Sequence, residues 1–188
     1  MNYGHAVLAD SKTNWISQCI KWFTKSQFSH SFITMPDVLD FPMCIEAYQG
    51  GVGMQRFDDG YLNNTDEGVE VWNINVSQDV KDQALKQMID DLEINYGFLQ
   101  YPWFMWRRIN TWFGRDIKAQ NNWSKQGMIC SQLCVAYLRA LGLGDVLQGY
   151  GNGSIAPEDL RTIFRAHPEV FTVIYRVRLA EPDVPWTA

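Results

Sequence analysis

A cysteine that opens a predicted helix and a histidine on a predicted strand far upstream carry the side chains best suited to chemistry. Cys130 begins the run Cys-Ser-Gln near the start of segment 129–141, whose apolar residues recur at helical spacing. Unpaired backbone N–H groups and the helix dipole stabilise a thiolate at a helix start. His30 lies in the strand-like run 28–35 and could take the thiol proton. The pair predicts a thiol nucleophile of the kind used in acyl transfer.

The same predicted helix carries a second cysteine that we interpret differently. Its inward stripe consists of Cys130, Leu133, Cys134, Tyr137, Leu138 and Leu141. Cys134 lies one turn deeper, beyond the strongest influence of the helix terminus, so inert core packing is its better interpretation. A small buried apolar residue is also the alternative interpretation of Cys130. The presence of His30 and Glu46 favours the nucleophile.

Glu46 is the candidate partner of the histidine. If the runs 28–35 and 43–48 pair across a turn at 36–42, His30 lies opposite residue 46 or residue 48. Both positions share the parity of His30, so Glu46 and His30 project from the same face. A carboxylate beside an imidazole fixes its tautomer and stabilises the imidazolium. The alternatives are a solvated strand charge for Glu46 and a hydrogen-bonded core histidine for His30.

The remaining histidines and the cysteine spacing indicate no second site. His5 has no neighbouring acid or thiol, and His167 precedes a proline at a turn, so we expect both to be structural or exposed. The chain contains no Cys-x-x-Cys or His-Glu-x-x-His pair, no P-loop and no Gly-x-Ser-x-Gly motif. Cys130 and Cys134 could share a metal only with two distant ligands. We therefore expect no metal and no cofactor.

Composition bounds the class of protein. With 188 residues, 46% hydrophobic and 20% charged, the chain is typical of one globular domain, which we expect to span 1–188. The formal charge is -5, so the chain lacks the excess of basic residues that nucleic-acid binding requires, and we expect no nucleic-acid partner. Four dispersed cysteines suit reduced thiols. Without a leader or a membrane-spanning apolar run, we expect synthesis in a cytoplasm, with packaging into a virus particle or lysis left open as routes out.

Periodicity and turn residues predict an α+β domain, a small and mostly antiparallel sheet packed by helices. The predicted strands cover 5–9, 28–35, 43–48, 54–57, 68–76 and 171–179. The predicted helices cover 14–25, 78–94, 101–113, 129–141 and 157–166. Within the aromatic segment 98–123, the run 101–108 has aromatic residues next to arginines and indicates helix packing, with a wall of the substrate cleft or a peripheral lipid contact as the alternative.

The order of these motifs resembles the circularly permuted branch of the NlpC-type papain-like hydrolases, in which the histidine strands precede the cysteine helix. The matching motifs are Ser29-His30, Ile45-Glu46-Ala47 followed by Gly51-Val52, Cys130-Ser131-Gln132-Leu133, and Pro157-Glu158-Asp159-Leu160. The resemblance covers about residues 5–165. It implies a permuted papain-like fold with Cys130 as nucleophile, His30 as general base and Glu46 as orienting acid. It also suggests Tyr96 as an oxyanion donor.

The resemblance further implies hydrolysis of a peptide or amide bond, with cell-wall peptides of peptidoglycan as the leading substrate class. Acyl-amide or lipid substrates, cleaved or used in acyl transfer, form the alternative class. A non-catalytic binding or structural module on the same fold is a second alternative. The sequence does not indicate the oligomeric state.

Overall fold

The computed structural model describes residues 2–12, 15–48, 51–89, 110, 129–150 and 155–185. In these ranges six strands form one antiparallel sheet in the order β4-β3-β2-β1-β5-β6. The strands are β1 (Ala6–Ser11), β2 (His30–Val38), β3 (Phe41–Tyr48), β4 (Gly51–Arg56), β5 (Glu67–Ile74) and β6 (Phe171–Val177). The helices are α1 (Trp15–Thr24), α2 (Gln78–Ile89), α4 (Cys130–Ala140) and α5 (Pro157–Ala166), with a π-helical turn η1 (Asp58–Leu62) and a 3-10 turn η2 (Gly144–Leu147). The predicted α+β class is confirmed.

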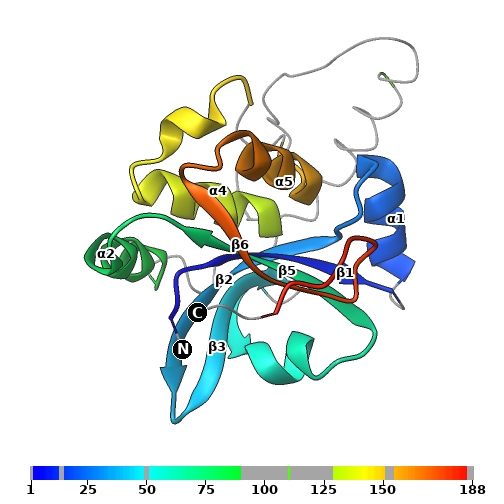
Figure 1. The fold of residues 1–188 in the computed structure, drawn as a ribbon, viewed down its shortest axis with the longest axis horizontal. Coiled ribbons are helices and arrows are strands. Elements are labelled where there is room, and N and C mark those ends of the chain that lie inside the picture. The colour runs from blue at the N-terminus through cyan, green and yellow to red at the C-terminus, as the bar shows by residue number, and fades with distance from the viewer. Residues whose placement is uncertain are drawn as a thin grey trace.

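The sheet is buried on both faces. Side chains alternate along each strand, so Leu8 and Ile33 pack with α2, α4 and α5 in a large apolar core. On the opposite face Phe32 packs with Tyr61 of η1 in a second, smaller cluster. Figure 1 shows α4 and α5 on one side of the sheet and η1, in teal, on the other. The strand β2, which begins with His30, therefore lies between two packed layers.

The hairpin between β2 and β3 is tighter than the sequence predicts. We expected a turn over 36–42, but the strands extend into this range and leave only the two-residue turn Leu39–Asp40. Both residues have positive φ, 51° and 66°, a conformation whose twist matches that of paired strands. Pro36 is accommodated in β2 because the β2–β3 ladder is irregular at this point.

The other described elements match their predicted ranges to within a few residues, with one exception. β4 begins at Gly51, whereas the glycines at 50–53 predicted a break in the sheet. Gly53 pairs with Glu46, and a Cβ at this position would lie 3.0 Å from the ring of Tyr48, so a glycine lets the two strands pair beneath this ring. Apart from residue 110, the predicted helix 101–113 and the whole aromatic segment 98–123 lie outside the described residues.

A buried carboxylate joins α5 and β6 to the sheet. Glu70 of β5 is fully buried and accepts hydrogen bonds from Arg161 Nε and Nη2, both at 3.0 Å. Arg176 Nε of β6 donates at 2.5 Å, and Trp72 Nε1 donates at 2.9 Å. One carboxylate thus satisfies two guanidinium groups from different elements, which compensates for removing all three charges from water.

The helix α5 also fixes the entry to β2. Glu158 Oε2 accepts hydrogen bonds from the Gln27 backbone N–H at 3.1 Å and from Ser26 Oγ at 3.3 Å. Ser26 Oγ in turn accepts from the Phe28 backbone N–H at 2.8 Å. Because these contacts order the three residues that lead into the strand, α5 helps to position His30 from far along the chain.

We expect Glu70→Gln to destabilise the fold by about 3 kcal/mol, since it removes the buried carboxylate of Arg161 and Arg176 and leaves them only the half-buried Glu181. The matched control is Arg165→Gln, which removes an exposed pair with Glu181 and should cost less than about 1 kcal/mol. Urea unfolding measures both changes. Equal losses for the two variants would contradict the structural role assigned to Glu70.

Candidate active site

Cys130 occupies the first position of α4. Ile129 before it keeps an extended backbone, with φ −97° and ψ 164°, and its N–H donates to Gln132 Oε1 at 3.2 Å. Cys130 retains 6% exposure, whereas Cys134 one turn later is fully buried. Burial raises the pKa of the Cys134 thiol to about 12, as expected for a cysteine that only fills the core.

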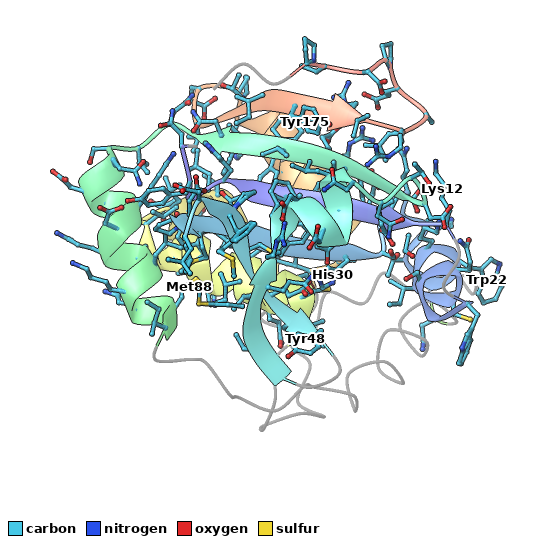
Figure 2. All side chains as sticks on the ribbon, turned by 90° about the horizontal axis from the view of Figure 1, so that it is seen from below. Lys12, Trp22, His30, Tyr48, Met88 and Tyr175 are labelled. Carbon is cyan, nitrogen blue, oxygen red and sulfur yellow. The ribbon has the colours of Figure 1, made fainter. Side chains whose placement is uncertain are left out.

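His30 and Glu46 meet on one face of the β2–β3 pair. The observed register pairs Ile33 with Ile45, and its continuation places Glu46 opposite Phe32 and His30 opposite residue 48. Glu46 is thus the diagonal neighbour of His30. Its Oε2 lies 2.6 Å from His30 Nε2, and the two side chains are 5% and 21% exposed. Figure 2 shows His30 and Tyr48 on the same side of the molecule.

The His30 imidazole also lies close enough to the Cys130 thiol for each group to shift the pKa of the other. The backbone N–H groups of Ser31 and Ser131 also point to the sulfur and favour its anionic form. Three elements therefore converge: β2 provides the imidazole, β3 the carboxylate and α4 the thiol.

The contacts invert the usual order of thiol and imidazole pKa values. Burial alone raises the pKa of Cys130, but the hydrogen bond and charge of His30 together with the two backbone N–H groups bring it below its ordinary value. Burial alone lowers the pKa of His30, but its bonds to Cys130 and Glu46 prevail and raise it to about 10. Both shifts favour the thiolate form of Cys130 and the imidazolium form of His30.

Glu46 stays ionised although it is buried. Burial raises the pKa of its carboxyl group, and hydrogen bonds from His30 and Tyr61 outweigh that effect and lower it. Tyr61 Oη donates to Glu46 Oε2 at 2.6 Å, the same oxygen that faces His30. Sequence reasoning missed Tyr61, because it lies in η1 between two predicted strands. The aromatic pair Phe57 and Tyr61, four residues apart, was the one available signal of a helical turn there.

Other predicted residues lie apart from this arrangement. Tyr96, suggested as an oxyanion donor, lies outside the described residues. His5 is buried, and its desolvation together with the charge of Lys81 lowers its pKa to about 4. His167 is exposed and lies 3.1 Å from Glu169. These positions agree with the structural and exposed roles expected for the two histidines.

The comparison with solved structures supports the fold. Over 96% of this chain and 98% of the other, the structure is similar to the crystal structure of metalloprotein yiiX from Escherichia coli O157:H7, DUF1105, with a TM-score of 0.63. The sequences are 15% identical, so the likeness shows a shared α+β fold alone. No family model matches the chain. No curated protein sequence matches it either.

The described residues do not fit a metal centre. Within the described ranges, no three His, Cys, Asp or Glu side chains gather in a way that could hold an ion. Glu46 Oε2 instead lies 2.6 Å from His30 Nε2, so these two groups pair with each other. In the same part of the chain, no helix has the length and apolar character needed to cross a bilayer.

We expect Cys130 to be alkylated by iodoacetamide at neutral pH faster than the exposed Cys19, because its pKa is lowered. In His30→Ala the rate at Cys130 should fall at least about tenfold, since an ordinary thiol is only a few per cent ionised at pH 7. Mass spectrometry of the labelled peptides measures each cysteine separately.

Cys19 is the internal control and should label equally in both proteins. Labelling of Cys130 no faster than that of the buried Cys134 would contradict the thiolate assignment.

Proposed function

We propose that this protein is a cysteine hydrolase that cleaves an amide or peptide bond through a thiol acyl-enzyme. The observation that carries the proposal is the His30 imidazole, which lies 2.6 Å from the Glu46 carboxylate and close enough to the Cys130 thiol for each group to shift the pKa of the other. The arrangement matches the roles of nucleophile, general base and orienting acid. The shared fold and the order of the sequence motifs support membership of the permuted NlpC-type papain-like branch.

In the acylation step, His30 holds the proton that Cys130 gives up, and the thiolate attacks the substrate carbonyl carbon. The negative charge moves to the carbonyl oxygen, where the backbone N–H of Cys130 is the available donor at the helix start. Tyr96 is proposed as the second donor. The imidazolium then protonates the leaving nitrogen, the carbon–nitrogen bond breaks, and a thioester to Cys130 remains.

In the deacylation step, neutral His30 removes a proton from water, and the resulting hydroxide attacks the thioester carbon. Collapse of this intermediate breaks the carbon–sulfur bond, releases the carboxylic acid and returns the thiolate. Glu46 remains ionised throughout, so it stabilises the imidazolium each time His30 gains a proton.

Cell-wall peptides are the substrate class that the motif resemblance favours. A panel of muropeptides, N-acyl amino acids and lipid esters, incubated with purified protein, tests this class against the acyl-amide and lipid alternatives. Turnover together with a Cys130 adduct of the acyl mass would support a hydrolase. Absence of turnover and of any adduct across the panel would favour a binding or structural module instead.

We expect Cys130→Ala to reduce turnover to background and His30→Ala to reduce it by about 10²–10⁴-fold, the usual contribution of a general base. Glu46→Gln should lower kcat less than His30→Ala, because Glu46 orients the imidazole and does not react. Steady-state kinetics with circular dichroism as the folding control measure these effects. Unchanged kcat in Glu46→Gln would show that another residue holds His30.

The pH profile of kcat/KM should be bell-shaped and wide. Activity should rise as Cys130 deprotonates, below the ordinary thiol pKa, and should fall as the imidazolium loses its proton near pH 10. Initial rates across the pH range measure both limbs. A falling limb close to the ordinary histidine value of about 6.5 would contradict the assigned protonation states.

A further inference from the structure

We infer that Tyr61 is a positioning residue of this site and that Arg178 holds it in place from the other end of the chain. Any effect of these two residues on turnover rests on the proposed function, whereas their effect on the Cys130 thiolate does not. Neither residue belongs to the three predicted from the motifs.

The Tyr61 hydroxyl donates to the carboxylate oxygen that the imidazole uses. Both Tyr61 Oη and His30 Nε2 lie 2.6 Å from Glu46 Oε2. Tyr61 is 8% exposed, and burial followed by the Glu46 charge raises the pKa of its phenol well above the ordinary value. It therefore keeps its proton and remains a hydrogen-bond donor wherever the protein is folded.

The Tyr61 ring is fixed by its aromatic neighbours. It stacks on Phe32 with the ring centroids 4.3 Å apart and lies nearly parallel to His30, at 13° and 6.4 Å. Phe57 packs against both Phe32 and Tyr61, at 5.7 and 6.2 Å. These rings cover the face of the sheet at Glu46. The hydrogen bond between the Tyr61 hydroxyl and the Glu46 carboxylate is therefore shielded from water.

Arg178 hydrogen-bonds to the backbone at and near Tyr61. Its guanidinium donates to the carbonyl oxygens of Tyr61 at 2.8 Å, Leu62 at 3.3 Å and Glu67 at 2.6 Å. These are carbonyl groups at the end of η1 and at the start of β5, where a cation is favourable. The residue that follows β6 is thereby tied to the turn beneath the active-site carboxylate.

The backbone of Arg178 supports a dedicated role. Its φ is +58°, a left-handed conformation that non-glycine residues rarely adopt because it is strained. Its N–H donates to Asp183 Oδ1 at 3.0 Å, which helps to stabilise this conformation. This strained backbone lets Arg178 donate two hydrogen bonds to η1 and one to the first residue of β5, which supports a positioning role.

Tyr61 affects the charge of the Cys130 sulfur through Glu46 and His30. Its hydroxyl keeps Glu46 ionised, the carboxylate favours the imidazolium of His30, and the imidazolium favours the thiolate of Cys130. The titratable groups that face this path are Cys44 on β3, Glu67 on β5, His30 on β2 and Cys130 on α4.

The test is the pH dependence of Cys130 alkylation in Tyr61→Phe, which removes only the hydroxyl. We expect the midpoint of the alkylation profile to move to higher pH, and the rate at neutral pH to fall about three- to tenfold, the effect of losing one hydrogen bond. Arg178→Asn should shift the profile in the same direction, since asparagine tolerates the left-handed backbone but cannot reach three carbonyl groups.

The matched control is Tyr175→Phe, which alters another tyrosine packed against the same apolar cluster. It should leave the profile unchanged. Thermal unfolding of each variant separates stability from positioning, because a merely structural loss lowers the melting temperature without moving the pH midpoint. A Tyr61→Phe profile that superimposes on the wild type would overturn the inference.

The two proposals fail separately. A shifted profile in Tyr61→Phe with no turnover of any panel substrate would support the positioning role and contradict the hydrolase. Turnover by the wild type with an unshifted Tyr61→Phe profile would do the reverse.

Discussion

A buried carboxylate that stays ionised favours the charged form of the histidine beside it. Glu46 is 4% exposed, and burial alone would favour its neutral form. Donors from two separate elements, His30 on β2 and Tyr61 on η1, meet at a single oxygen and reverse that preference. The charges of Cys130 and Glu46 together favour the imidazolium form of His30, and the imidazolium in turn favours the thiolate form of Cys130.

The fold supplies the rigidity that this arrangement needs. β2 is central in the sheet and buried on both faces, so His30 begins a strand that has little freedom to move. The helix α4 packs on that strand and brings its N-terminal end to the imidazole. Contacts from α5 order the entry to β2, and Arg178 secures η1 on the other face. Elements from both ends of the chain therefore hold the side chains of His30, Glu46 and Cys130 in place.

Part of this site could be predicted from the sequence because it depends on local periodicity. The two-residue repeat of a strand puts His30 and Glu46 on one face in either register, and the start of a helix is the place where a cysteine is activated. The turn was predicted too wide because Leu39–Asp40 lacks the glycine or asparagine that usually marks a two-residue turn. Tyr61 could not be predicted, because its role depends on a π-helical turn placed under β3 by tertiary packing. The prediction that Cys130 lies near His30 came from the order of the motifs, since no periodicity relates residues a hundred positions apart.

The most direct test is the protonation state of His30 in the folded protein. The chain has three histidines, so proton–nitrogen correlation spectra across a pH titration, assigned with His5→Gln and His167→Gln, resolve its ring. We expect His30 to remain an imidazolium through neutral pH and to lose its proton only near pH 10. A neutral imidazole at pH 7, titrating near its ordinary value of about 6.5, would contradict it.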